Sequence, residues 1–437
     1  MMRRRLRIDR LTTVWMIVAI VVEPVVILFP SAFSQPLWTG VHVVTLGVVL
    51  TSILQWSWHF AQGLLHLPPQ TSRARGWRSA RVLLVHSGLV VILVAMSLAS
   101  WGGALVGVVA VLVAIIGHAI AIFHALRTPF AATFTPTMRY PLAGLGCFAA
   151  GISLAPFMLA AMWWPNAPDG LVRARDGLTL AHVVLNVFGG VGLTIAGVLV
   201  TLGPTVLRQR AHPRALAWAR RALGPAVACI VVAAGAVATS HHRLAAGAEF
   251  AWGLVLALAI GAPVAAVASR SRRREIAPAT MGCALAWLAV AFLGVVWATW
   301  RHADPAAVRG ACLVFYVVGA VGGCVQLICG ALEYLMPMTV GGGPRPLKVG
   351  LAQMGAYGGA RLAARNTALL LAVVMPGPAR IACIAIVALT YVWEIATFIR
   401  AARAQATARR LAGPQMPQPL SAPTLLAQAS RPKESDQ

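Results

Sequence analysis

The sequence predicts an all-α, polytopic membrane bundle of about twelve transmembrane helices. Three observations carry this prediction. Only 11% of the 437 residues are charged and the mean hydropathy is +0.78, whereas a soluble domain is about a quarter charged. The apolar residues form continuous runs of about twenty, the length that spans a bilayer core. Arginines occupy alternate connections between these runs, as the loops of a multi-pass protein do.

The expected helices follow the apolar runs, which are continuous rather than alternating as in a transmembrane strand. They cover residues 12–33, 38–62, 80–101, 103–125, 140–163, 178–202, 222–240, 247–268, 279–300, 307–335, 360–377 and 379–400. The run at 360–377 is the weakest, because it is short and carries Arg361 and Arg365 at its start. The first run is long enough to span and lacks a good cleavage site, so we expect a retained helix rather than a signal peptide.

Positive charge sets the expected orientation. Arginines cluster before the first run and after every even-numbered run, and the cluster after the tenth run includes Arg361 and Arg365. Because cytoplasmic loops are rich in Lys and Arg, both termini are predicted to be cytoplasmic, in a multi-pass protein of the cell membrane. Topology thus explains the net charge of +25, and we expect a lipid bilayer rather than nucleic acid as partner.

The chain divides into two expected parts. A transmembrane helical domain covers residues 1–400, and a cytoplasmic tail covers residues 401–437. The tail is rich in Pro, Gln, Ala and Ser without an apolar period, which is typical of disorder. The seven cysteines lie inside apolar runs without a CxxC pair, so we interpret them as small buried hydrophobic residues.

Two histidines occupy equivalent places in two runs. His42 lies in WTGVHVV and His182 in LTLAHVV, each about one helical turn inside the predicted outer surface. If the second and sixth helices face each other, the imidazoles lie at matched depth and can hold a haem iron or share a copper. The alternative for each is a buried histidine that only bonds a backbone carbonyl, although ionisable groups within a membrane usually have a function.

Other histidines form two groups by depth. His241 and His242 end the seventh helix on the outer side, where both imidazoles could reach one copper ion. His86 and His118 come to similar depth near the cytoplasmic face. Each of the latter two is more readily explained as a buried polar residue that is hydrogen-bonded.

Four carboxylates fall in or at the edges of the runs: Glu23, Glu249, Glu333 and Glu394. A buried unpaired carboxylate is costly, so each is protonated, paired or functional. Glu333 is expected to reach the inner interface or to pair with an inner arginine, whereas Glu23 and Glu394 are deeper and could carry protons. Such carboxylates, with twelve helices and both termini inside, also suit a secondary transporter.

A family resemblance rests on three stretches: GVHVVTLGVVLTSILQWSWHF, LTLAHVVLNVFGGVGLTIAGVLVTLGPTVLRQR and YLMPMTVGGGP. They resemble actinobacterial proteins that form the twelve-helix membrane part associated with copper oxidases and nitrite reductases. More distantly, the chain is similar to NnrS and to subunit I of the haem–copper oxidases. The resemblance implies haem b, copper or both near the outer side. It implies His42 as a haem ligand, and a copper site at His182, His241 and His242.

The sequence departs from the oxidases at the residues that reduce oxygen. The tenth helix lacks the histidines that bind the two haems, and Asn186 stands where a tyrosine would follow His182. We therefore expect a haem- or copper-binding protein of respiratory, nitric-oxide-related or copper-related type that does not reduce oxygen, working with a redox partner or in a membrane complex. The alternatives are a secondary transporter and a non-catalytic subunit.

Overall fold

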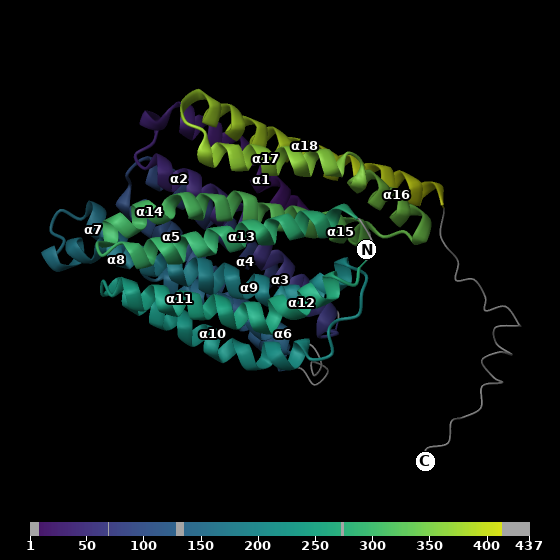
Figure 1. Ribbon diagram of the computed structural model, residues 1–437, viewed down its shortest axis with the longest axis horizontal. Coiled ribbons are helices and arrows are strands. Elements are labelled where there is room, and N and C mark those ends of the chain that lie inside the picture. The colour runs from purple at the N-terminus through teal and green to yellow at the C-terminus, as the bar shows by residue number, and fades with distance from the viewer. Residues whose placement is uncertain (1–7, 69, 128–134, 272–274, 413–437) are drawn as a thin grey trace, which may run out of the picture.

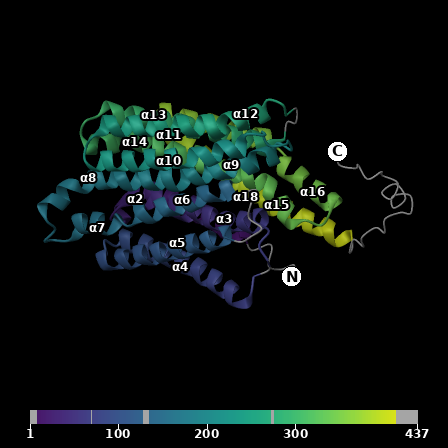
Figure 2. The same ribbon diagram turned by 90° about the horizontal axis from the view of Figure 1, so that it is seen from below.

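In the computed structural model, the described residues are 8–68, 70–127, 135–271 and 275–412, and every regular element within these ranges is a helix. The long helices run side by side along the long axis of the molecule (Figures 1 and 2). The elements are α1 (Ile8–Leu28), the 3₁₀ turn η2 (Pro30–Ala32), α2 (Pro36–His42), η3 (Val43–Leu50), α3 (Thr51–Leu64), α4 (Ser72–Ser97), α5 (Trp101–Leu126), α6 (Thr135–Ile152), α7 (Ala155–Trp163), α8 (Asp169–Val184), η4 (Leu185–Gly192), α9 (Leu193–Val206), α10 (Ala215–Ala238), α11 (His242–Leu256), η5 (Ala257–Gly261), α12 (Ala262–Ala268), α13 (Ile276–Arg301), α14 (Pro305–Val318), η6 (Gly319–Val325), α15 (Gln326–Val340), α16 (Pro344–Gly355), α17 (Gly358–Val374) and α18 (Gly377–Leu411).

Within the described residues, eleven helical stretches are long and apolar enough to cross a membrane. Each corresponds to one of the predicted apolar runs, so an all-helical, polytopic membrane bundle is confirmed. The remaining predicted run, 360–377, is α17, which has 17 residues and packs along α18. At 1.5 Å per residue α17 is about 25 Å long, slightly less than the roughly 30 Å of a bilayer core.

Four of the spans pass from α-helical to π-helical hydrogen bonding within their length, at η3, η4, η5 and η6. A π-helical segment is uncommon and is found mostly at functional sites. All four segments contribute residues to a single large cavity. The irregular turns are therefore gathered around one place in the bundle.

Small residues let the helices around this place approach closely. A side chain at Gly144 of α6 would meet the carbonyl oxygen of Gly190 in η4 at 2.8 Å. One at Gly107 of α5 would meet Ile92 of α4, also at 2.8 Å. Helix contacts of this kind replace the hydrophobic effect as the source of association within a bilayer.

The C-terminal helix continues past residue 400, where the sequence predicts the tail to begin. The Gln405 side chain donates to the carbonyls of Pro337 and Gly341, at 2.8 and 3.0 Å, and Arg409 donates to that of Val340 at 2.8 Å. These contacts bond carbonyls at the C-terminal end of α15, of which that of Pro337 also accepts from the N–H of Gly341. They hold α18 in a helix to Leu411; residues 413–437 of the predicted tail lie outside the described residues.

Candidate functional site

A cavity of about 1620 Å³ lies among the helices that carry His42 and His182. It is lined mainly by aliphatic and aromatic side chains from many of the spans. The typical small-molecule site has roughly 300–1,000 Å³, so a flat cofactor the size of a haem would fit. Its polar or charged lining residues include Glu23, His42, Thr45, Arg175, Thr179, His182, Asn186, Arg309, Tyr316 and Tyr391.

His42 is the last residue of α2, directly before the π-helical turn η3. Its Nδ1 lies 2.8 Å from the carbonyl oxygen of Trp38. The imidazole also stacks on the Trp38 indole, with ring centroids 4.0 Å apart and planes inclined by 15°. Because a carbonyl oxygen only accepts hydrogen bonds, Nδ1 carries the proton and Nε2 of the neutral ring keeps a free lone pair.

His182 is held in the same way from a different helix. Its Nδ1 lies 2.8 Å from the carbonyl oxygen of Gly151, at the end of α6. A side chain at Gly151 would meet the Asn186 amide nitrogen at 2.6 Å, so only glycine lets α6 approach this closely. Asn186 in turn donates to the His182 carbonyl at 2.6 Å. The orientation of the second imidazole therefore depends on contact between two spans.

The two histidines belong to one site. Both line the same cavity, and their imidazoles are close enough to interact electrostatically. Within the part of the chain that the structure describes, Nε2 of neither ring has a hydrogen-bond partner. An imidazole whose Nδ1–H is bonded to a carbonyl, with Nε2 free, has the arrangement of a metal-binding histidine.

The three histidines predicted to bind copper, His182, His241 and His242, do not share the arrangement found for His42 and His182. His241 is exposed and lies 3.0 Å from the Thr239 hydroxyl, whereas His242 is buried and neither of its ring nitrogens has a partner among the described residues. Among the described residues, no group of three or more His, Cys, Asp or Glu side chains is placed to hold a metal ion. A copper site formed by His182, His241 and His242 stays a prediction from the resemblance.

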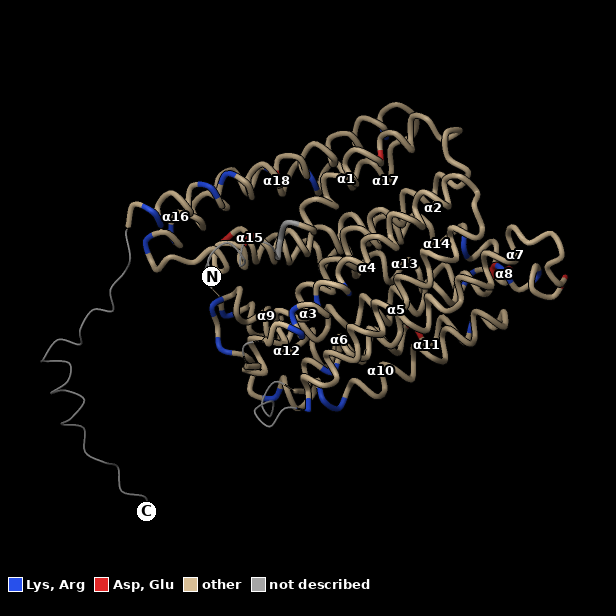
Figure 3. The backbone as a smooth tube through the Cα atoms, turned by 180° about the vertical axis from the view of Figure 1, so that it is seen from behind, with Lys and Arg blue, Asp and Glu red and all other residues tan. Residues whose placement is uncertain are grey.

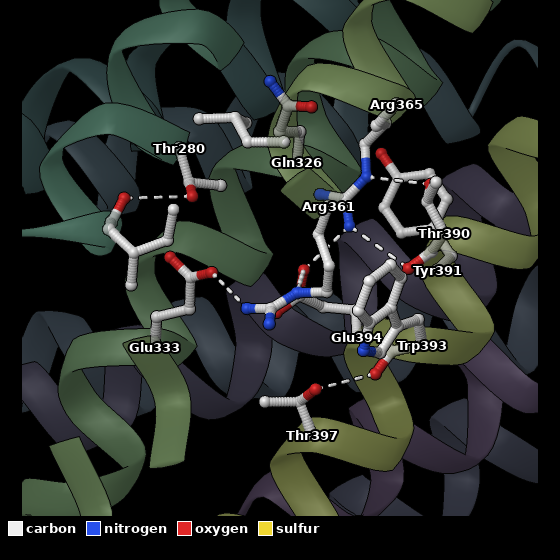
Figure 4. Close-up of polar contacts among 12 residues, drawn as sticks. Thr280, Gln326, Glu333, Arg361, Arg365, Thr390, Tyr391, Trp393, Glu394 and Thr397 are labelled. Carbon is white, nitrogen blue, oxygen red and sulfur yellow. Dashed lines mark hydrogen bonds and ion pairs between the residues drawn. The ribbon is translucent and has the colours of Figure 1, made fainter. Parts of the chain in front are cut away.

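A second polar site consists of four charged residues buried between α15, α17 and α18 (Figure 4). Arg361 and Arg365 are each 1% exposed, and Glu333 and Glu394 are 2% and 1% exposed. The sequence counts the two arginines among the charges of an inner loop, and that assignment is wrong. They lie in the first two turns of α17. They can be buried there because the carboxylates of Glu333 and Glu394 neutralise them.

Arg361 joins the two carboxylates of this ion cluster. Its Nη2 lies 3.4 Å from Glu333 Oε1 and its Nε lies 3.3 Å from Glu394 Oε2. Arg365 donates from Nη2 to the same Glu394 oxygen at 2.7 Å. Further N–H groups of Arg361 donate to two backbone carbonyls, at 2.6 and 3.1 Å. Two positive and two negative charges thus neutralise each other, which burial in a membrane demands.

The ion cluster adjoins the large cavity through Tyr391. The Arg365 guanidinium lies over the Tyr391 ring, 4.2 Å from its centroid. Tyr391 lines the cavity and donates its hydroxyl to the Val321 carbonyl in η6 at 2.6 Å. The sequence signal for the cluster is a pair of arginines four residues apart opening an apolar run, opposite carboxylates in two other runs. That pattern does not identify which charges meet.

Two further carboxylates each have an oxygen without a partner among the described residues. Glu23 lines the cavity and rests against the backbone of Gly40, with Oε1 unpartnered. Glu249 is buried beside Thr299, with Oε2 unpartnered. Both differ from Glu333 and Glu394 in that no arginine contacts them in the described residues.

Comparison with known families and with curated proteins identifies no homologue of this chain. No known protein family matches the chain, and no curated protein matches it either. The class of protein therefore follows from the fold alone: this is an integral, multi-pass membrane protein of the all-helical type.

Proposed function

We propose that the chain is a haem-binding membrane protein of the NnrS or haem–copper-oxidase-like type. In this proposal His42 and His182 would hold a haem b in the large cavity through their free Nε2 atoms. The observation that carries it is the matched hydrogen bonding of two rings that line one cavity, each with Nδ1 bonded to a backbone carbonyl and Nε2 free.

The proposed ligand set defines the role of the haem. A haem held by both His42 and His182 would supply electron transfer rather than activation of oxygen or another substrate. The apolar side chains of the lining would keep water from it. The chain would then pass electrons to or from a redox partner in respiration, nitric-oxide metabolism or copper handling, without reducing oxygen. Copper is the other occupant that imidazole favours, and it needs further ligands.

The proposed topology has twelve spans, with α17 as the eleventh, and both termini in the cytoplasm of a cell-membrane protein. Support comes from the distribution of Lys and Arg. Figure 3 shows them gathered mainly at the end of the bundle that holds α3, α9, α12 and α16. The positive-inside tendency makes this the cytoplasmic end, and places His42 and His182 nearer the outer surface.

The test is the optical spectrum of the purified protein together with haem and metal analysis. We expect one haem per chain, with the Soret and split visible bands of six-coordinate, bis-histidine iron. His42→Ala and His182→Ala should each remove this spectrum, while His124→Ala, at an exposed histidine at the end of α5, should keep it. Protein that carries neither haem nor stoichiometric copper would overturn the proposal.

A secondary transporter is the second candidate, favoured by the unpartnered oxygen of Glu23 in the cavity lining. A carboxyl group that is unpaired inside a membrane can take up and release a proton as a substrate passes. Proton-coupled uptake into proteoliposomes that survives His42→Ala and His182→Ala, but not Glu23→Gln, would establish this function instead.

A further inference from the structure

A second, much smaller cavity of about 40 Å³ lies between α3, α4 and α5, apart from the haem site proposed above. His86 and His118, which the sequence places at similar depth, both line it. The polar lining residues used in the argument are Gln55, Trp58, Arg78, Arg81, His86 and His118.

Several hydrogen-bond donors at this cavity have no acceptor. Trp58 Nε1, Gln55 Nε2 and Arg81 Nε are buried without a partner among the described residues, as are both ring nitrogens of His86. Two oxygens of the same lining, Gln55 Oε1 and Thr51 Oγ1, are also unpartnered there. Trp58 and Gln55 are only 7% and 8% exposed. Indole and guanidinium N–H groups can only donate, and buried donors without an acceptor are costly. A species with accepting lone pairs between them would satisfy the indole and guanidinium donors.

The charged residues of the lining are both positive, which indicates that this species is negatively charged. Arg78 and Arg81 are close enough to repel each other, and both act on His118. No Asp or Glu lines the cavity, and neither arginine has an ion pair within the part of the chain that the structure describes. Like charges in a partly desolvated place are unfavourable unless a counter-charge is supplied.

We propose that this cavity binds a small monovalent inorganic anion, between a halide and nitrate in size. A water molecule needs roughly 10–15 Å³ of such space, so the 40 Å³ present holds about three water-sized atoms. The anion accepts hydrogen bonds from Trp58 and Arg81, and its single negative charge offsets one of the two positive charges of Arg78 and Arg81. Arg78 is half-buried, which leaves a route from the aqueous surface.

The test compares bromide and nitrate with gluconate, which is too large for the cavity, at equal ionic strength. The full-length protein in detergent should show a saturable rise in melting temperature with bromide or nitrate only. Arg81→Gln removes one guanidinium with its charge-assisted hydrogen bonds, and should weaken this binding about tenfold or more. Arg73→Gln, at an exposed arginine of the same helix, should bind as the wild type does.

A direct measurement on the wild type covers the case in which Arg81→Gln does not fold. Anomalous scattering from bromide should give a peak between Arg81 and Trp58. Ordered water alone in the cavity at saturating bromide would overturn the proposal, and so would identical salt responses of Arg81→Gln and Arg73→Gln. The haem spectrum should be the same with and without bromide, so failure of this site is distinguishable from failure of the haem proposal.

Discussion

The histidine cavity and the ion cluster are adjacent, but the buried polar groups differ in how far they are bonded within the protein. In the cavity, His42 and His182 each use one ring nitrogen on a carbonyl and leave the other free. In the ion cluster, Arg361 and Arg365 bond to two carboxylates and to backbone carbonyls. Tyr391 forms the wall between the two sites.

The difference teaches how to separate a binding site from a structural one. Both sites place costly groups inside a membrane domain, so burial alone does not discriminate. A cluster whose charges cancel has little left to offer a ligand, and removing one member should destabilise the fold. A pair of nitrogens that face a cavity is left incomplete, and removing one should cost the ligand and leave the fold intact. The following substitutions test that contrast.

The largest effect on stability is expected from Glu394→Gln. This substitution keeps the shape but leaves two buried guanidinium groups with one carboxylate. Breaking a buried ion pair on one side typically costs about 3–5 kcal/mol. Thermal unfolding in detergent should show the loss, while folded protein keeps its haem spectrum. An unchanged melting temperature would mean that the cluster contributes no stability.

Gly151→Ala should destabilise the contact between α6 and α8 that orients His182. The added methyl group would meet the Asn186 amide at 2.6 Å, and overpacking of this kind costs about 1–3 kcal/mol. It also pushes α6 away from His182, so the haem should bind more weakly. Gly146→Ala is the matched control on the same helix, because nothing lies within 4 Å of its added methyl group. Equal haem loss in both variants would contradict the role given to the Gly151 carbonyl.

Trp38→Leu should have a smaller effect confined to His42. The backbone carbonyl that accepts from His42 remains, but the stacked indole is lost. An aromatic contact contributes about 0.5–1.5 kcal/mol, so haem affinity should fall by up to about tenfold in a haem-transfer assay. Trp164→Leu, which removes an exposed tryptophan, serves as the control. A Trp38 variant with wild-type affinity would show that the carbonyl alone orients the ring.

Asp176→Asn should have the smallest effect. Its partner Arg309 lies 3.2 Å away, and the two side chains are 32% and 47% exposed. Exposed ion pairs contribute about 0–1 kcal/mol and are screened by salt. The melting temperature should change little, and any difference from wild type should vanish at high salt. A fall in melting temperature as large as that of Glu394→Gln would contradict the expectation that buried ion pairs stabilise this protein more than exposed ones.

Much of this arrangement was predictable from the sequence. The apolar runs predicted the membrane class and the position of the long apolar helices, and the sequence singled out His42 and His182, which line one cavity. The sequence also identified Glu333 and Glu394 as carboxylates in need of a partner. It misassigned Arg361 and Arg365, because an arginine at the start of a short apolar run looks the same whether it faces water or a carboxylate on another helix.

The sequence by itself determined the all-helical membrane class and where each polar residue falls along its apolar run, since both depend only on local composition and on 1.5 Å of rise per residue. Only the tertiary structure decided which faces of the helices meet. The Gly151 carbonyl opposite His182, the cavity ringed by π-helical turns and the pairing of Arg361 with Glu394 all depend on it. The rotation of a helix about its axis is fixed by packing against helices that are distant in the chain. Within a bilayer the lipid tails are as apolar as the protein interior, so the polarity of the sequence does not distinguish a helix face that meets lipid from one that meets another helix.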